Sequence, residues 1–253
     1  MKRLQGRVAL ITGAGAGIGK GLARRFAAEG ASLWLADINA AAGESAAAEI
    51  RSEFGVKVGF ATTDVSERAA VQDMVGAAQQ HFGRVDILVN NAALMIEAVA
   101  FQIDTIPIEQ WEKVMHVNTT GALICAQSVI PSMRARGGGR IINQTSGGAF
   151  PAKSVYGISK LALVGLTTSL AKQLGKDNIT ANAIAPGNVT SEAGSMLVPP
   201  DSPFAQYLAS MVCTKAQGAP DELVGTLLLL CSEAGQWITG QTIHVDGGWV
   251  IRP

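Results

Sequence analysis

Tyr156 and Lys160 are the residues of this chain whose types and spacing most directly suggest chemistry. They stand four residues apart, and on a helix such residues lie on one face, so a phenol and an ammonium could act on one bound molecule. A phenol ionises at about pH 10, and neighbouring positive charge lowers that pKa. The pair could therefore donate and accept a proton. A solvated helix face is the alternative, because such pairs also occur by chance.

Two further polar residues could complete such a site. Ser146 follows a strand-like run and precedes the tyrosine by ten residues, so its hydroxyl could hydrogen-bond a substrate carbonyl. Thr145, its neighbour, is held in reserve for that role. Asn118 falls inside a helix-like segment over 107–133, where an asparagine could disturb the helix and hold a polar network. Taken singly, each of these residues could equally be a cap or a surface polar group.

A glycine-rich segment near the N-terminus predicts a phosphate-binding turn. An apolar run at 8–11 leads into Thr12-Gly13-Ala14-Gly15-Ala16-Gly17-Ile18-Gly19. This order predicts a strand, a tight turn and a helix start, where bare backbone and unpaired N–H groups suit a phosphate. A Walker-type loop would need glycine at Ala14 and a hydroxyl at Gly21, and the strict G-x-G-x-x-G pattern also fails. A merely flexible turn is the alternative to a site for a nucleotide diphosphate.

More polar residues follow later strand-like runs, where ligands bind on a parallel sheet. Asp37 closes the second run, and a carboxylate there could accept both ribose hydroxyls of NAD while repelling the 2′-phosphate of NADP. No arginine or lysine stands beside it to neutralise such a phosphate. Asp64 and Asn90–Ala93 follow the third and fourth runs and suit packing beside an adenosine. A solvated turn aspartate and loop-capping amides are the alternatives.

These residues need a scaffold, and the apolar pattern predicts one. Strands are predicted near 7–12, 32–36, 57–63, 86–89, 139–145, 179–184 and 242–245, and helices near 17–29, 40–53, 67–82, 107–133, 154–174 and 220–231. Such alternation predicts a doubly wound α/β fold, in which a parallel sheet of about seven strands is flanked by helices on both faces. We expect a single domain over residues 1–253.

Composition excludes several classes of function. The formal net charge is zero without a basic tract, so nucleic acid is not an expected partner. No apolar run approaches the ~20 residues of a membrane span, and no signal peptide is evident, so we expect a cytoplasmic protein that does not enter a membrane. Neither a disulfide framework nor a metal site is expected, because the cysteines and histidines are scattered: Cys125, Cys213, Cys231, His81, His116 and His244.

Together these pieces resemble the short-chain dehydrogenase/reductase family over nearly the whole chain. The matching motifs are Thr12-Gly13-x-x-x-Gly17-x-Gly19, Asp64, Asn90-Asn91-Ala92, Asn118, Ser146, Tyr156-x-x-x-Lys160 and Pro186-Gly187. The resemblance implies a Rossmann-type fold and hydride transfer between NAD(H) and a substrate carbon. It also implies four catalytic roles: Tyr156 as acid/base, Lys160 on the nicotinamide ribose and tuning the tyrosine, Ser146 polarising the carbonyl, and Asn118 holding a water relay.

The cofactor-binding residues implied by the resemblance are Gly13, Ala16, Gly17, Ile18, Gly19, Asp37, Ile38, Asp64, Val65, Asn91, Ala92, Tyr156, Lys160, Pro186, Gly187, Val189 and Ser191. The sequence departs from the family pattern in three places. The loop between serine and tyrosine is shorter than usual, Ala93 replaces a glycine, and Ser191 replaces a threonine, with Thr190 as the neighbouring alternative.

The substrate is expected to be neutral. The segment near 188–220 is predicted to be a substrate lid, although simple packing onto the core is the alternative. Its basic residue is Lys215, and Lys153 lies in the loop before the tyrosine, whereas an anionic substrate would favour arginine. We therefore expect a largely apolar secondary alcohol and its ketone.

Other functions stay open at this point. Within enzymes they are reduction of a carrier-bound 3-oxoacyl group and oxidation of a cyclic diol; outside enzymes, an NAD(H)-binding sensor or scaffold without turnover. The helix predicted over 154–174 and the segment 243–251 are apolar on several faces, which predicts self-association. The resemblance implies a homotetramer, commonly with 222 symmetry.

Overall fold

A parallel sheet of seven strands forms the centre of the molecule. The computed structural model describes residues 2–189, 202–214 and 217–251. All seven strands run parallel in the order β3-β2-β1-β4-β5-β6-β7. They are β1 Val8–Thr12, β2 Ser32–Asp37, β3 Val58–Thr62, β4 Ile87–Asn90, β5 Gly139–Gln144, β6 Ile179–Pro186 and β7 Thr242–Val245. The predicted doubly wound architecture and its seven strands are confirmed.

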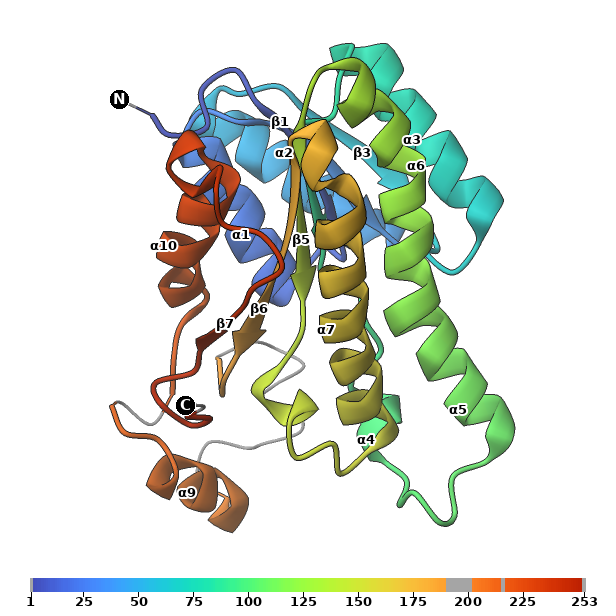
Figure 1. The fold of residues 1–253 in the computed structure, drawn as a ribbon, viewed down its shortest axis with the longest axis vertical. Coiled ribbons are helices and arrows are strands. Elements are labelled where there is room, and N and C mark those ends of the chain that lie inside the picture. Colours follow the sequence, from blue (N-terminus) through green and yellow to red (C-terminus); the bar gives the residue numbers. More distant parts are fainter. Residues whose placement is uncertain (1, 190–201, 215–216, 252–253) are drawn as a thin grey trace.

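Helices cover both faces of the sheet, as Figure 1 shows. They are α1 Gly17–Ala28, α2 Ala40–Phe54, α3 Arg68–Phe82, α4 Ile96–Val99, α5 Ile108–Met115, α6 Gly121–Ala135, α7 Val155–Leu174, α9 Pro203–Ser210 and α10 Pro220–Cys231. Helices α1, α2 and α10 pack on one face, and α3, α6 and α7 on the other. None of the described helices combines the length and the hydropathy needed to cross a bilayer.

The alternation of side chains along β1 explains the two layers. Ala9 and Ile11 point into the core beneath α1, where Phe26 is fully buried. Leu10 points the opposite way, into the core beneath α6, which contains Met133. Because successive strand residues face opposite sides and both sides are covered, the strand must be apolar throughout. This is why its sequence is an unbroken apolar run.

The segment predicted as one helix over 107–133 is interrupted, and that prediction is corrected. Helix α5 and helix α6 are joined by a π-helical turn at His116–Thr120, in which the N–H of Gly121 bonds to the carbonyl of His116. The wider turn inserts one extra residue per turn and is typical of functional sites. Asn118, buried at its centre, is the residue whose unfavourable helix position suggested such a disturbance.

Two short helices were not predicted. Helix α4 is too short for an apolar period to be recognised. Helix α9 begins with a capping serine, Ser202, whose hydroxyl accepts a hydrogen bond from the Ala205 N–H at 3.1 Å, followed by proline at the first helical position. That signal was present in the sequence. Much of the predicted lid, residues 190–201 and 215–216, lies outside the described residues.

The fold places the glycine-rich turn at the point where the order of the strands reverses. Strand β1 pairs with β2 on one side and β4 on the other, so the ends of β1 and β4 mark the switch point, where doubly wound sheets have their ligand crevice. Gly13 and Gly17 have φ angles of 62° and 54°, a conformation that L side chains rarely adopt. Gly19 fits because a Cβ there would overlap the carbonyl oxygen of Gly13. Backbone conformation therefore requires glycine at positions 13 and 17, and close packing requires it at position 19.

Replacing Gly19 with alanine is expected to lower the free energy of unfolding by about 2 kcal/mol, because the methyl group overpacks the turn. Gly76→Ala is the matched control. It lies in the interior of α3, where a Cβ meets nothing within 4 Å, and it is expected to raise the free energy of unfolding by about 0.5 kcal/mol. Urea unfolding of both variants measures the difference. Equal effects would contradict the packing argument.

Candidate active site

Tyr156 and Lys160 lie in the first turns of α7, beside the carboxyl end of β5. Ser154 caps this helix, because its hydroxyl accepts a hydrogen bond from the Gly157 N–H at 3.3 Å. Capping fixes where the helix starts and hence where the tyrosine points. The ammonium nitrogen of Lys160 lies 5.6 Å from the centre of the Tyr156 ring. The predicted shared face of the two side chains is thus realised.

Lys160 is buried without a carboxylate partner among the described residues. Its side chain is 2% exposed, and its Nζ donates a hydrogen bond of 2.8 Å to the backbone carbonyl of Gln144, the last residue of β5. The remaining two N–H groups have no protein partner in the described part of the chain. Burial lowers the pKa of Lys160 to about 8. A lysine held this way is ready to donate hydrogen bonds to a bound molecule.

The pKa of Tyr156 differs from the expectation that neighbouring positive charge would lower it. Burial raises the pKa of Tyr156 to about 12, and the nearby Ser146 hydroxyl acts in the opposite direction. In the protein alone, desolvation of the phenolate therefore dominates. The expected lowering is not a property of the lysine–tyrosine pair by itself.

The structure distinguishes Ser146 from Thr145. The Thr145 hydroxyl is buried and donates to the carbonyl of Ile184 at 2.8 Å, which ties β5 to β6. The Ser146 hydroxyl instead faces the phenol of Tyr156 and accepts a hydrogen bond from the Gly148 N–H at 3.1 Å. The short loop between serine and tyrosine thus still brings these two hydroxyls together. Geometry favours Ser146 over its neighbour for contact with a reacting oxygen.

Asn118 connects three parts of the site. Its side-chain oxygen accepts from the Leu94 N–H at 2.7 Å, and its amide donates to the Leu94 carbonyl and to the Ser159 hydroxyl, both at 3.0 Å. Ser159 in turn donates to the carbonyl of Tyr156 at 2.7 Å. Both amide donors are therefore used within the protein. Asn118 fixes the loop after β4 against the start of α7.

Asp37 lies beside the glycine-rich turn at the end of β2. One carboxylate oxygen accepts from the Gly15 N–H at 2.8 Å and the other from the Asn39 N–H at 2.9 Å. Each oxygen keeps a lone pair for another donor. Ile38, the next residue, is 68% exposed at the same edge. The predicted contact between this carboxylate and a ligand in the turn is sterically open.

The side-chain amide of Asn91 bonds within the protein. Its amide donates to the backbone carbonyls of Thr12 and Gly13 at 2.8 and 2.9 Å, so both of its N–H groups hold the glycine-rich turn. The Thr12 hydroxyl accepts from the N–H groups of Asn91 and Ala92, both at 3.1 Å. The two loops at the crevice therefore form one hydrogen-bonded unit. In this arrangement the side chain of Asn91 braces the glycine-rich turn from the loop after β4.

The remaining predicted residues divide between the crevice and the core. Ala16 and Gly17 are exposed where α1 begins, whereas Ile18 packs partly against the core. The Asp64 carboxylate accepts two hydrogen bonds from Ser66. Three of them are buried at or just beyond strand ends: Val65, Pro186 and Val189. The N–H of Gly187, just beyond β6, donates a hydrogen bond to the carbonyl of Val245. Ser191 and Thr190 lie outside the described residues.

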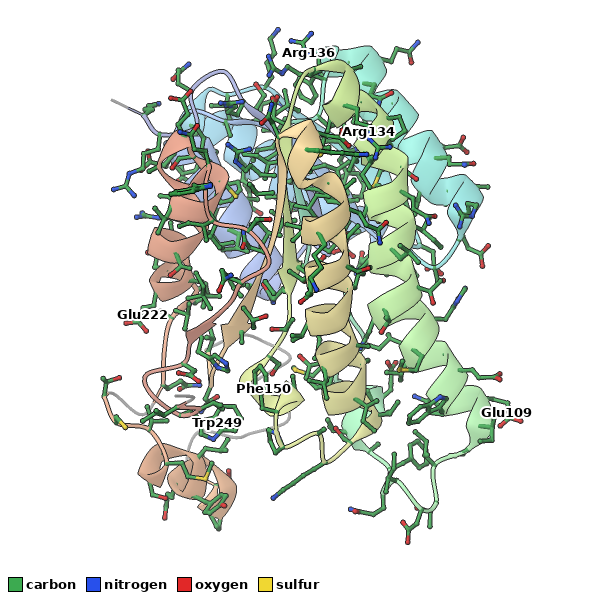
Figure 2. All side chains as sticks on the ribbon, viewed as in Figure 1. Glu109, Arg134, Arg136, Phe150, Glu222 and Trp249 are labelled. Carbon is green, nitrogen blue, oxygen red and sulfur yellow. The ribbon has the colours of Figure 1, made fainter. Side chains whose placement is uncertain are left out.

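Sequence reasoning missed three residues that support the site. From the sequence, Thr12 is named only as part of the glycine-rich motif. The available signal is its place at a strand end, where a hydroxyl can accept hydrogen bonds from loop N–H groups. For Ser159, the sequence signal is its place directly before Lys160. No sequence pattern indicates that Trp249 supports the site. Its ring lies against Gly147, where a Cβ would come within 2.7 Å of it, and Figure 2 shows it near Phe150 at this end of the molecule.

Trp249 is positioned by a turn built on Asp246. That carboxylate accepts hydrogen bonds from the N–H groups of Gly248 and Val250 at 3.0 and 2.9 Å. The turn brings the indole onto the loop that follows Ser146. The C-terminal segment therefore packs against the loop that follows Ser146.

The pKa of Lys160 makes the stability of the ligand-free protein depend on pH. Its pKa is about 8 in the folded protein and 10.5 for an unperturbed lysine, so unfolding takes up a proton between these pH values and stability rises with pH. Between pH 7 and 9.5, we expect the free energy of unfolding to rise about 2 kcal/mol more in the wild type than in Lys160→Met. Tyr156, with its pKa raised from 10, lowers stability only above that window.

Urea unfolding at several pH values measures this difference. Lys172→Met is the matched control, because Lys172 is exposed on the same helix and the variant should follow the wild type. Parallel pH curves for the wild type and Lys160→Met would contradict the burial of a titrating ammonium.

Comparison with known proteins places this geometry in a family. A family model described as enoyl-(acyl carrier protein) reductase matches residues 13–250. The chain is 40% identical over 249 residues to an uncharacterized oxidoreductase of Mycobacterium tuberculosis, covering 97% of this chain and 98% of that protein.

Two solved structures share the whole fold. One is L-sorbose reductase from Gluconobacter frateurii in complex with NADPH and L-sorbose, with a TM-score of 0.91, 32% identity and 100% coverage of both chains. The other is a 7α-hydroxysteroid dehydrogenase in complex with NADH and 7-oxoglycochenodeoxycholic acid, with a TM-score of 0.91 and 33% identity, covering 99% of this chain and 96% of that one. With the motifs found here at the strand ends, these matches show that the chain belongs to the short-chain dehydrogenase/reductase family of oxidoreductases, enzymes that act on CH–OH groups.

Proposed function

We propose that this protein interconverts a neutral, largely apolar secondary alcohol and its ketone with NAD(H), using Tyr156 as the acid/base. The observation that carries the proposal is the convergence of the Ser146 hydroxyl, the Tyr156 phenol and the Lys160 ammonium at the carboxyl end of β5. A carbonyl oxygen placed there would meet two hydroxyl donors. The Lys160 ammonium lies over the ring of the phenol, 5.6 Å from its centre.

The crevice has the donors and acceptors that a nicotinamide dinucleotide needs. Helix α1 starts at Gly17 without a side-chain cap, so its first N–H groups are free to bind a pyrophosphate. Asp37 has open lone pairs for ribose hydroxyls, and Lys160 has unused N–H groups for the second ribose. When bound, NAD(H) supplies or accepts the hydride.

The side chains divide the proton chemistry between them. In the reducing direction Tyr156 donates its proton to the developing alkoxide, and Ser146 stabilises the same oxygen by a hydrogen bond. Lys160 stabilises the resulting phenolate, which burial alone disfavours. Asn118 acts as a positioning residue, because its amide holds Leu94 and Ser159 and has no donor left for a water.

Removing the phenol is expected to lower kcat about 10³-fold in Tyr156→Phe, because the proton has no other donor at that point. Ser146→Ala should lower kcat about 10²-fold through loss of one oxyanion donor. Thr145→Ser keeps the hydroxyl that bonds to β6 and should leave kcat within about twofold, since that hydroxyl faces away from the phenol.

Absorbance of NADH during turnover of neutral ketones measures all three variants. Cofactor binding, followed by NADH fluorescence, should persist in Tyr156→Phe. A larger loss in Thr145→Ser than in Ser146→Ala would overturn the assignment. Tight NADH binding without turnover of any alcohol or ketone by the wild type would favour a sensor instead.

We also propose that Asp37 selects NAD(H) over NADP(H). Its carboxylate lies 2.8 Å from the Gly15 N–H, at the edge of the turn, and a 2′-phosphate would bring like charge against it. The related solved structures contain NADPH in one case and NADH in the other, so the preference rests on this carboxylate. Ile38 beside it offers no positive charge.

The expected result is that kcat/KM with NADH exceeds that with NADPH by at least about tenfold in the wild type, and that Asp37→Asn narrows the ratio by about tenfold. Asp73→Asn, exposed on α3, changes the net charge equally and should leave the ratio unchanged. Steady-state kinetics with both cofactors decide it. A wild-type preference for NADPH would refute the proposal.

A cavity of about 200 Å³ beyond the end of β6 supports a neutral substrate. It is lined by Asn188, Val189, Val212, Thr214 and Leu223 together with the acidic Glu222 and Asp246. Among the described residues lining it, none is basic. Lys153 is exposed in the loop before Tyr156, and Lys215 lies outside the described residues. Carboxylates here would repel an anionic substrate.

We propose in addition that the chain works as a homotetramer. Leu161 on α7 and Leu229 on α10 are large apolar side chains that are 41% and 39% exposed. They lie on helices that pack on opposite faces of the sheet. Two separate apolar surfaces are what an assembly with 222 symmetry would bury.

A further inference from the structure

A second cleft opens at the amino ends of the strands, the edge of the sheet opposite the candidate active site. Its volume is about 880 Å³, within the range of small-molecule sites. Its walls come from the segments just before β1, β4, β5 and β6 and from the end of α6. Figure 2 shows the two ends: Arg134 and Arg136 lie at one, Phe150 and Trp249 at the other.

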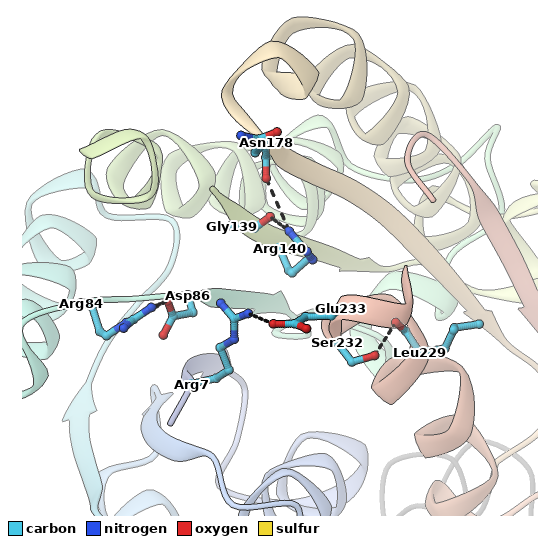
Figure 3. A network of polar contacts seen from close by, with 9 residues as sticks. All are labelled: Arg7, Arg84, Asp86, Gly139, Arg140, Asn178, Leu229, Ser232 and Glu233. Atoms are coloured by element: carbon cyan, nitrogen blue, oxygen red, sulfur yellow. Dashed lines mark hydrogen bonds and ion pairs between the residues drawn. The ribbon is translucent and has the colours of Figure 1, made fainter. Parts of the chain in front are cut away.

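The lining of this cleft is strongly basic. Among the described residues it contains Arg7, Arg84, Arg136 and Arg140 but a single carboxylate, Asp86. Figure 3 shows that three of these arginines come from separate segments of the chain. The fold therefore brings together arginines that are far apart in the sequence.

Two of the four guanidinium groups are already neutralised. Arg84 forms an ion pair with Asp86, whose other oxygen accepts from the Val8 N–H at 2.8 Å. Arg7 lies 3.5 Å from Glu233. The carboxylates of Asp86 and Glu233 are thereby used. Arg136 and Arg140 are left with no carboxylate within 4 Å in the described part of the chain.

Arg140 is the more buried of the two, since Arg136 is exposed. Its Nη1 donates to the carbonyls of Gly139 and Asn178 at 2.9 and 3.4 Å, while its Nε is buried and bonds to nothing among the described residues. Burial and then repulsion from Arg7 lower the pKa of Arg140. A half-buried cation of this kind is favourable only when an anion accompanies it. A small rotation of the guanidinium into the cleft would present Nε to one.

Two more residues indicate the kind of anion. The Thr180 hydroxyl, at the start of β6 and 6% exposed, is another buried donor without a partner among the described residues. Trp237, on the rim, is 97% exposed, so the face of its indole is available for stacking. Guanidinium forks and a hydroxyl suit the oxygens of a phosphate. The indole suits a flat ring attached to it.

We propose that this cleft is a second ligand site, which binds a phosphate monoester through Arg136 and Arg140 and its attached aromatic ring through Trp237. The site is separate from the proposed cofactor crevice, because the two lie at opposite ends of the same strands. Its test is therefore independent of the proposed catalytic function.

Calorimetric titration of the full chain with inorganic phosphate and with phenyl phosphate tests the site at low ionic strength, with sodium chloride at equal ionic strength as the blank. Both probes should bind saturably, and phenyl phosphate more tightly. Arg136→Gln should weaken both about tenfold, through loss of one charged hydrogen-bonding partner. Trp237→Ala should weaken phenyl phosphate about fivefold and leave inorganic phosphate unchanged.

Arg134→Gln is the matched control. Arg134 lies at the same end of α6 but pairs with Asp177 at 2.7 Å and does not line the cleft, so its replacement should change neither affinity. Binding that both Arg136→Gln and Trp237→Ala leave intact would belong to the start of α1 and would overturn the proposal. So would the absence of saturable binding. Light scattering completes the test: a change of molar mass in Trp237→Ala, without loss of phenyl phosphate affinity, would show that the indole contacts another copy instead.

Discussion

Strand β1 is hydrogen-bonded to β2 on one side and to β4 on the other, and the site depends on this pairing. Because the chain changes its direction of winding here, the ends of β1 and β4 mark the position at which doubly wound sheets bind ligands. Thr12 and Asn91 then lock the two loops to each other through four hydrogen bonds between 2.8 and 3.1 Å. The loop after β4 also carries Leu94, which Asn118 holds. A ligand at the glycine-rich turn therefore shares one rigid frame with the start of α7.

The sequence was sufficient for the sheet because its strands are buried on both faces and must be apolar throughout. Strand β1 is an example, since every residue is buried and residues 8–11 are all apolar. Strand β6 is equally buried, although it includes the polar residues Thr180 and Asn182. It was insufficient for the segment 107–133, where only the position of Asn118 hinted at a π-helical turn. The apolar period continues through that turn, and the wider hydrogen bonding depends on contacts with Leu94 and Ser159 that no local pattern encodes.

The same limit applies to individual side chains. Tyr156, Lys160 and Ser146 could be located because helix spacing and strand ends fix their direction. The use of Asn91 could not, because an amide at a strand end serves a ligand or a neighbouring loop equally well, and only the structure shows its N–H groups on Thr12 and Gly13. The pKa of Tyr156 was also beyond the sequence, since it depends on how much solvent the fold excludes.

Burial acts on the two titrating groups of the site in opposite directions, and both shifts favour the neutral form. The pKa of Tyr156 rises to about 12 while that of Lys160 falls to about 8. Exclusion of water alone would thus leave a neutral phenol beside an ammonium that loses its proton more easily than a lysine in water. Among the described residues, the Ser146 hydroxyl acts the other way and lowers the pKa of the phenol. A ligand that contributes positive charge near Tyr156, as an oxidised nicotinamide would, lowers the pKa of the phenol. In the oxidising direction of the proposed reaction, proton transfer would therefore depend on prior cofactor binding. The opposite edge of the sheet obeys the same rule in reverse: Arg140 keeps its charge although burial and Arg7 oppose it, and what would stabilise it is negative charge from outside.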